Sequence, residues 1–299
     1  GNVHFGPFKD SKSTAHATAY SELHTKSEFC ANCHQVFHPL NDMPIERTYD
    51  EWKNSIYAQK GIQCQDCHMQ PIENAIEVAR TFRKPKNSGW AAKGAPKRPH
   101  IYTHEFVGGN FTITGLMGAA KHADLAKQRL RSAATVDVLA PKNVIPGSIG
   151  NFSVKVTNVG AGHDLPTSLT EVRQMWLDIK VTDSAGKVLL TSGDINAEGD
   201  IDPSAVMYHA VAADSEGNPT LKPWEMSYFL YKKTIPAKGH SVERYSFLAP
   251  ADAKGDVVIT ATLRYRSFPQ SLANFLLGES APKLPVVDMA TGTSVVPVK

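Results

Sequence analysis

Two short stretches of the chain carry residues whose types and spacing suit the covalent binding of a cofactor. Residues 30–34 (CANCH) and 64–68 (CQDCH) both read C-x-x-C-H, the attachment pattern of c-type haem. The two thiols of such a motif bond to the porphyrin, and the histidine binds the iron from the proximal side. Positions i, i+3 and i+4 of a helical turn share one face, so all three side chains can face one macrocycle. We therefore predict two haem c groups, attached through Cys30, Cys33, Cys64 and Cys67, with His34 and His68 as the proximal iron ligands.

Three other cysteine chemistries fit these residues less well. Two C-x-x-C pairs can form a four-thiolate zinc site, but residues 35–63 make a longer gap than a zinc ribbon has, and zinc leaves both histidines unexplained. A thioredoxin-like pair needs a strand followed by a helix, which neither stretch indicates. Disulfides would consume the same four cysteines, which are all that the chain contains.

The second axial ligand of each iron decides whether a haem carries electrons or performs chemistry. Nine of the twelve histidines lie before residue 134, which favours ligation of each iron by two histidines and a low reduction potential. His104 is the first distal candidate, because the nearby Phe106 and glycines allow a flat ring to approach the backbone. His16, just upstream of the first motif, is the second. His163 lies in a Gly- and Pro-bounded loop, from which it could reach a haem and join two domains.

The remaining potential ligands rank lower. His24, His100 and His122 have no distinguishing context, and His38 follows His34 so closely that we expect it on the proximal side. Ligation by Met43 or Met117 would raise the potential, whereas Met69 directly follows a proximal histidine and cannot easily reach the far face. For each histidine the alternative is an ordinary surface or hydrogen-bonded side chain.

The composition is that of a globular protein. The chain has 299 residues and a formal net charge of +3, which gives no support to a nucleic-acid partner. No apolar run approaches the roughly 18 to 20 residues that span a bilayer. The sequence starts at Gly1 without a Met, so we expect a processed product or a piece of a longer polypeptide. Haem c attachment takes place on exported chains, so we expect a periplasmic, cell-surface or extracellular protein.

The character of the sequence changes near residue 133. The predicted fold class is α+β, with a mostly helical or irregular dihaem c domain over residues 1–133 followed by an all-β, immunoglobulin-like sandwich over 134–299. Helices are expected over 13–24, 48–61 and 113–133. Alternating apolar residues predict strands over 135–139, 151–158, 175–182, 187–191, 227–232, 241–248, 256–266 and 284–289.

Two further segments have a possible binding role. Residues 194–202 alternate oxygen-bearing side chains around a glycine, like a calcium loop, but Ala205 stands where a glutamate would be expected, so an acidic surface loop is favoured. Residues 83–99 are rich in Lys, Arg and Pro. This segment is interpreted as a solvated loop, with a basic rim for an acidic redox partner or a haem propionate as the alternative.

Several of these motifs together resemble a known family. Residues 27–34, 46–52, 64–69 and 104–108 are similar to the multihaem cytochromes c of the cytochrome c554-related group. Residues 162–167, with Arg173, Trp176 and 263–266, resemble the β-sandwich tail of some members. The resemblance implies electron transfer in anaerobic or metal-respiring metabolism, with His104 matching a family histidine often placed as a distal ligand. Larger members carry further haem motifs upstream.

The resulting hypothesis is an electron carrier that relays electrons between exported redox proteins through two low-potential haems. Further haem subunits or a second copy of the chain are possible partners. The alternative is a dihaem enzyme, a peroxidase or an oxyanion reductase, in which one iron keeps an open position. A haem-based sensor is a third possibility, which no particular residue favours.

Overall fold

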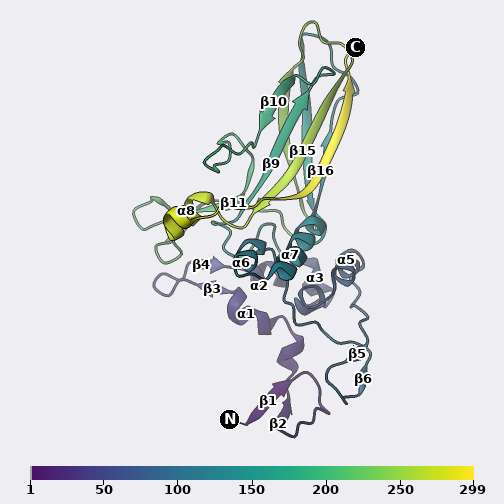
Figure 1. Cartoon of the computed structure of the whole chain (residues 1–299), viewed down its shortest axis with the longest axis vertical. Coiled ribbons are helices and arrows are strands. Elements are labelled where there is room, and N and C mark those ends of the chain that lie inside the picture. The colour runs from purple at the N-terminus through teal and green to yellow at the C-terminus, as the bar shows by residue number, and fades with distance from the viewer. Residues whose placement is uncertain (1) are drawn as a thin grey trace.

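The structure is a computed structural model that describes residues 2–299. The molecule is elongated (Figure 1): a β-sandwich forms one end, short helices form the middle, and two small ladders lie at the other end. The first ladder pairs β1 (Val3–Gly6) with β2 (Ala17–Tyr20) in parallel. The second pairs β5 (Gly89–Trp90) with β6 (Lys97–Arg98).

The sandwich consists of two unequal antiparallel sheets. The larger, seven-stranded sheet contains β9 (Gln174–Thr182), β10 (Val188–Ser192), β11 (Met207–Ala213), β12 (Pro219–Thr220), β13 (Tyr228–Lys233), β15 (Asp256–Arg266) and β16 (Val287–Pro297). The smaller sheet has the order β14 (His240–Leu248), β8 (Ile149–Asn158) and β7 (Ala134–Leu139).

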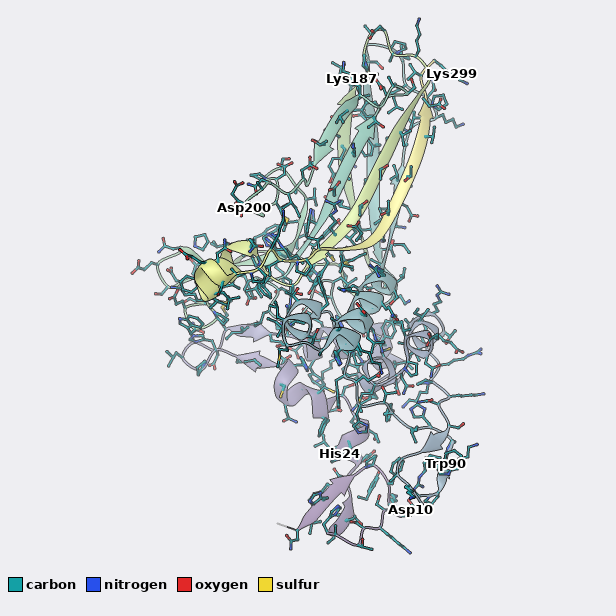
Figure 2. The ribbon with its side chains drawn as sticks, viewed as in Figure 1. Asp10, His24, Trp90, Lys187, Asp200 and Lys299 are labelled. Carbon is teal, nitrogen blue, oxygen red and sulfur yellow. The ribbon has the colours of Figure 1, made fainter. Side chains whose placement is uncertain are left out.

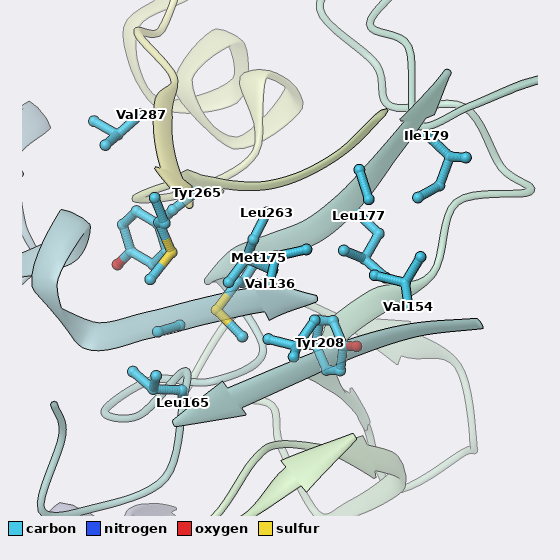
Figure 3. Close-up of a cluster of buried hydrophobic side chains, with 14 of the residues drawn as sticks. Val136, Val154, Leu165, Met175, Leu177, Ile179, Tyr208, Leu263, Tyr265 and Val287 are labelled. Atoms are coloured by element: carbon cyan, nitrogen blue, oxygen red, sulfur yellow. The ribbon is translucent and has the colours of Figure 1, made fainter. Parts of the chain in front are cut away.

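The core of the sandwich follows from the two-residue period of its strands. In β8 the alternate side chains of Phe152, Val154 and Val156 are buried, and they face the buried Leu177 and Ile179 of β9. Figure 3 shows part of this cluster between the sheets. The apolar alternation that is visible in the sequence therefore builds this half of the molecule.

Two helices close the end of the sandwich that faces the haem motifs. α6 (Phe111–Leu116) begins at Asn110, whose side chain accepts a hydrogen bond from the Ile113 N–H. α7 (Ala120–Ala133) follows after Gly118, and its buried face joins the sandwich core through Ala123, Ala126 and Leu130. Residues on both sides of position 133 thus share one core, and the division at 133/134 stays a prediction.

The two C-x-x-C-H motifs lie among short helices. These elements are η1 (Glu22–Thr25), α1 (Glu28–His34), β3 (Val36–Phe37), β4 (Pro44–Glu46), α2 (Thr48–Lys53), α3 (Ile56–Gln59), α4 (Gln65–His68) and α5 (Ile72–Thr81). A small core of Trp52, Tyr57, Ile62, Val78 and Ala79 holds them together. The Trp52 indole donates to the Ile62 carbonyl at 2.9 Å, and Tyr57 donates to the Ala79 carbonyl at 3.0 Å. Cys64 and Cys67 pack against this core.

The expected α+β class, with a mostly helical first domain, is wrong. The chain is mainly β, with 33% strand and 22% helix. Residues 13–24 do not form a helix, because Ala17–Tyr20 pairs with β1 and only a 3-10 turn follows. The helix expected over 48–61 is interrupted where Ser55 accepts a hydrogen bond from the Tyr57 N–H and starts a new one.

The sequence also failed to indicate several elements of the second half. Strands β11 and β12 and the helix α8 (Gln270–Leu277), with its 3-10 continuation η2 (Gly278–Ser280), were not expected. The eight expected strands of the sandwich are present with small shifts at their ends, and the last extends further than expected, to Pro297. Among residues 2–299, no helix is long and apolar enough to cross a bilayer.

Candidate functional site

The two C-x-x-C-H turns touch each other. Ser27, buried at the start of the first turn, donates from its backbone N and its Oγ to Gln63 Oε1, at 2.8 and 3.0 Å. The Ser27 Oγ also accepts a hydrogen bond from the Cys64 N–H at 3.0 Å. With the thiols free, the interaction between the two sulfurs lowers the pKa of Cys64 and raises the pKa of Cys30. Groups attached to these two turns would be close neighbours.

In the first turn, the imidazole of His34 is held by a carboxylate. His34 Nδ1 lies 2.8 Å from Oε1 of Glu46, the last residue of β4, and Thr48 Oγ1 donates to the same oxygen at 3.3 Å. The contact with Glu46 raises the pKa of His34. Since a carboxylate accepts, Nδ1 carries the proton and Nε2 remains available as a ligand atom. The His34 side chain is 57% exposed.

In the second turn, the imidazole of His68 is held by a backbone carbonyl. Its Nδ1 donates to the Val107 carbonyl oxygen at 2.6 Å, and the backbone N–H of Val107 donates back to the His68 carbonyl at 3.2 Å. Burial, together with the nearby His163, lowers the pKa of His68 to about 4. At neutral pH the ring is therefore uncharged, with the lone pair of Nε2 free to bind a metal.

The ring of His163 faces His68 from the sandwich side. The two ring centroids are 6.2 Å apart and the planes differ by 19°. Two imidazoles that bind one metal ion from opposite sides, with bonds of about 2 Å each, have centroids about 6 Å apart. His163 Nδ1 donates to the Asp164 carbonyl at 2.8 Å, so its Nε2 is also free. These residues fit an iron ion with two axial histidines.

The loop that carries His163 is held tightly in place. A Cβ on Gly160 would lie 2.3 Å from the Ser132 carbonyl oxygen, so this glycine is required for the close approach of the loop to α7. Asn158 Nδ2 donates to the His163 carbonyl at 2.9 Å. Glu51 of α2 accepts from the Asp164 N–H at 3.3 Å and from Thr167 Oγ1 at 2.5 Å. The sandwich is thus hydrogen-bonded to the helices that present the motifs.

The structure places the other two distal candidates elsewhere. His104 is exposed and lies in the segment between Thr103 and Val107, which hydrogen-bonds to Met69 and His68 on the side of Val107. This segment therefore lies on the Nδ1 side of His68, away from the Nε2 atom that would bind a metal. His16 lies on the terminal ladder and stacks on His4, with centroids 3.8 Å apart. That spacing is too short for a metal ion between the two rings.

Several lower-ranked candidates already have other partners. His38 is buried and uses both ring nitrogens, with the Trp224 carbonyl and the Leu40 N–H. Both ring nitrogens of His100 also have partners, namely the Gln70 side chain and the Asn87 N–H. Met43 is buried beside Ala212 and Met226, whereas Met117 is 80% exposed.

His24, which the sequence ranked low, lies beside both turns. Its ring lies against Phe29 of the first turn, with centroids 5.0 Å apart, and its carbonyl accepts from Gln65 Nε2 of the second turn. Its Nδ1 is buried and has no hydrogen-bond partner among residues 2–299. Its position just before the first motif was the one available signal.

The acidic loop over 194–202 uses its oxygens internally. Asp202 accepts hydrogen bonds from the Gly193 and Ser204 N–H groups and from Ser204 Oγ, and Asn196 Oδ1 accepts from the Asp200 N–H. Within the described chain, residues 2–299, no group of three or more His, Cys, Asp or Glu side chains is arranged to hold a metal ion. A haem iron takes only two ligands from the protein, so this finding does not bear on the His68 and His163 pair.

Comparison with known proteins gives one informative likeness. No protein-family model matches the chain, and no curated protein matches it. Among solved structures, a penta-heme cytochrome c552 from Thermochromatium tepidum aligns over 94% of this chain with a TM-score of 0.62 and 18% identity. The match covers 59% of that cytochrome, so this chain spans about three-fifths of its length. The chain therefore has the fold of part of a multihaem cytochrome c, with its β domain included.

Two further solved structures align with about half of the chain. The CARDB domain of PF1109 from Pyrococcus furiosus covers 56% of it at 14% identity, with a TM-score of 0.27. Red sea bream transglutaminase covers 55% at 14% identity, with a TM-score of 0.25. Likenesses at this level carry no argument about the chain.

Proposed function

We propose that this chain binds two haem c groups covalently and transfers electrons between redox proteins. Cys30 and Cys33 would hold the first haem, with His34 as an axial ligand. Cys64 and Cys67 would hold the second, with His68 and His163 on its iron. The haems would supply one-electron chemistry, because ferric and ferrous iron interconvert without bond breaking at a six-coordinate centre.

The observation that carries this proposal is the pair of facing imidazoles, His68 and His163. Both rings direct Nδ1 to a backbone carbonyl, and they come from regions far apart in the sequence. Such fixation of the tautomer and of the ring orientation is typical of metal-binding histidines. Burial lowers the pKa of His68 to about 4, so its Nε2 atom is unprotonated at neutral pH and available as a ligand.

The residues of the chain also explain how the cofactor would be kept and tuned. Trp52 and Tyr57 form an apolar wall against which Cys64 and Cys67 pack, so water is excluded from one side of the second attachment turn. Glu46 and the Val107 carbonyl orient the two proximal rings. The likeness to a penta-heme cytochrome supports this proposal at the level of the fold.

The proposal includes several finer assignments. The chain would be a relative of the cytochrome c554-related group, with two haem motifs in residues 1–299 and an immunoglobulin-like tail. It would act in the periplasm, at the cell surface or outside the cell, because haem c is attached after export. Its partners would be exported redox proteins, further haem subunits or a second copy of the chain.

Spectroscopy of the purified holoprotein tests the proposal. We expect two haems per chain by mass and by the pyridine haemochrome assay, and a low-spin signal from the second haem. His163→Ala should convert that haem to high spin and allow the reduced protein to bind carbon monoxide, whereas His209→Ala on β11 should leave the spectrum unchanged. An unchanged spectrum in His163→Ala would disprove this ligand assignment, and zinc in place of iron would disprove the haem proposal.

A second candidate function is favoured by the exposure of the first turn. The His34 side chain is 57% exposed, whereas His68 faces a second imidazole, so the first iron would be the one whose sixth position stays accessible to small molecules. A dihaem peroxidase or oxyanion reductase would use this access. Carbon monoxide binding by the unmodified reduced protein, assigned to the first haem through Cys30→Ser/Cys33→Ser, would favour the enzyme.

A further inference from the structure

The segment 83–99 carries the densest group of uncompensated positive charges near the two motifs. It contains six basic residues and no acidic residue. Gly89 pairs with Arg98 and Trp90 pairs with Lys97, which makes the centre of the segment a short hairpin. We call residues 83–99 the basic hairpin; its cations are Arg83, Lys84, Lys86, Lys93, Lys97 and Arg98.

Most cations of the basic hairpin are exposed to solvent, and one of them lies over an exposed aromatic ring. All of them except Arg98 are exposed. Arg98 is also the one that forms an ion pair within residues 2–299, with Asp10 at 2.6 Å. Trp90 is 61% exposed, and Lys97 Nζ lies 5.3 Å from its ring centroid. Unneutralised cations around an exposed aromatic side chain are suited to bind an anionic surface.

The base of the basic hairpin is attached directly to the second haem motif. Asn87 exchanges hydrogen bonds with Ile101 and donates from its N–H to His100 Nδ1 at 3.3 Å. The other nitrogen of His100 lies 3.2 Å from Gln70, two residues after His68. Tyr102 donates to Asp66, which lies inside the C-x-x-C-H turn, at 3.0 Å. A protein bound to the hairpin would therefore lie close to this turn.

Two further contacts fix the orientation of the basic hairpin. Gly89 packs closely against the Ile101 side chain, since a Cβ at this position would lie 2.6 Å from Ile101 Cδ1. On the other side, the Arg98 guanidinium lies over the ring of Phe8 at 4.4 Å and pairs with Asp10. Figure 2 shows Trp90 and Asp10 at the same end of the molecule, opposite Lys187 and Lys299 at the tip of the sandwich.

From this arrangement we propose that the basic hairpin is the docking surface for an acidic redox protein that exchanges electrons with the haem on Cys64 and Cys67. The inference rests on the proposed function and adds the partner's charge and its point of contact. Opposite charges speed the encounter and orient the two proteins. A lipid surface fits less well, because Trp90 is the one large apolar side chain exposed on the hairpin within the described chain, where a membrane-binding segment would present an apolar face.

The test compares two triple variants of the holoprotein with the same change in net charge. The first variant, Lys84→Glu/Lys86→Glu/Lys93→Glu, reverses three charges of the basic hairpin. The second, Lys142→Glu/Lys187→Glu/Lys254→Glu, reverses three charges at exposed positions of the sandwich. Stopped-flow oxidation by hexacyanoferrate(III) is measured, in which the ferrous protein loses one electron to the trianion and no bond breaks. Poly-glutamate, an acidic surface without a redox group, is added as a competitor.

We expect the hairpin variant to react about tenfold more slowly than the wild type at low ionic strength and to lose inhibition by poly-glutamate. The sandwich variant should keep most of the rate and all of the inhibition. Oxidation by the cationic hexaammineruthenium(III) should not slow in either variant. Equal effects of the two variants on the hexacyanoferrate rate would overturn the proposal, since the charge of the whole molecule would then explain them.

Two controls separate this proposal from the one on which it rests. Haem content and reduction potentials are measured first, because their loss in the wild type would refute the haem assignment and not the docking surface. If the wild type binds vesicles of anionic phospholipid through the hairpin while poly-glutamate has no effect on electron transfer, the surface meets lipid and the proposed protein partner is wrong.

Discussion

The two C-x-x-C-H turns share five-residue spacing and differ in almost everything around it. In the first, His34 donates to the carboxylate of Glu46 and is open to solvent. In the second, His68 donates to a neutral carbonyl and faces His163 from the sandwich. A carboxylate partner makes the imidazole a stronger donor to iron and so favours the ferric state. The same motif, placed in two environments, would therefore give two haems of different potential, the first one lower.

The two turns also differ in how far along the sequence their supporting residues lie. The first turn is supported by residues that follow it closely, namely Glu46, Thr48 and Asp50. The second is supported by Val107 and by the loop around His163, which lie in later parts of the chain. Changes in the sandwich should thus act on the second haem and spare the first.

Removing one attachment site at a time gives the largest expected difference. Cys64→Ser/Cys67→Ser and Cys30→Ser/Cys33→Ser should each lower the mass of the protein by one haem. The first pair should also lower Tm by at least about 5 °C more than the second, because iron between His68 and His163 links the motif region to the sandwich. Equal Tm values in scanning calorimetry would contradict the link across the two regions.

The glycine beneath the His163 loop offers a less drastic test. In Gly160→Ala the new Cβ meets the backbone of Ser132, so the loop must shift, at a cost of roughly 1–3 kcal/mol. We expect partial high-spin character at the second haem and none at the first, measured by electron paramagnetic resonance. Gly6→Ala is the matched control, because nothing lies within 4 Å of the added atom. A purely low-spin spectrum in Gly160→Ala would argue against ligation from this loop.

The stability of the fold should depend on pH through Glu171, a buried carboxyl group near Glu46. Glu171 is 3% exposed, its carboxyl oxygens have no hydrogen-bond partner among residues 2–299, and burial, with Glu46 nearby, raises its pKa from 4.5 to about 7. The folded state thus binds this proton more tightly than the unfolded state. The stabilisation is complete below pH 4.5 and is lost as the pH rises through 7, by roughly 3 kcal/mol.

Glu171→Gln should remove this slope and unfold at a higher urea concentration than the wild type at pH 8. The exposed Glu198→Gln serves as the control. The idea fails if the stability of the wild type and of Glu171→Gln changes equally between pH 5 and pH 8.

The smallest effect is expected for Glu46, where only the charge changes. Glu46→Gln keeps a hydrogen-bond acceptor at His34 and removes the negative charge, so the potential of the first haem should rise by roughly a few tens of millivolts. The reduction potential of the second haem should change less. Spectroelectrochemical titration measures both, with Glu28→Gln on α1 as the control. A shift in the potential of the second haem alone would contradict the assignment of Glu46 to the first haem.

The sequence allowed prediction of features that depend on neighbouring residues. Period-two runs such as Phe152, Val154 and Val156 predicted the sandwich strands, whereas the attachment chemistry that the C-x-x-C-H spacing indicates stays a prediction. Helix prediction over 13–24 was wrong because pairing with β1, which no local pattern reveals, decided the conformation of Ala17–Tyr20. Strand β11 was missed because its burial alternates but its polarity does not: the half-buried positions include the apolar Met207 and Val211, and the buried ones are mostly alanine.

The candidate site was harder to predict because its geometry depends on contacts distant in sequence. The sequence ranked His104 above His163 because Phe106 and the nearby glycines would allow a flat ring to approach, whereas in the structure the segment around His104 hydrogen-bonds to the backbone of the second turn. The useful signal was the pair of glycines before His163, which allow the loop to pass close to α7 and Tyr57. Nothing in the sequence linked Glu46 to His34, since the antiparallel ladder of β3 and β4 brings them together.

The position of His163 has a consequence for how the protein is made. If the proposed haems are present, synthesis from the N-terminus would release both attachment turns well before the sandwich residues, so the thioether bonds could form while the second iron still lacked its far ligand. Closure of the sandwich would then bring His163 to a porphyrin that is already attached. Haem attachment would thus precede folding of the β half. The sandwich could bring His163 to the iron only in chains in which the second haem is already attached.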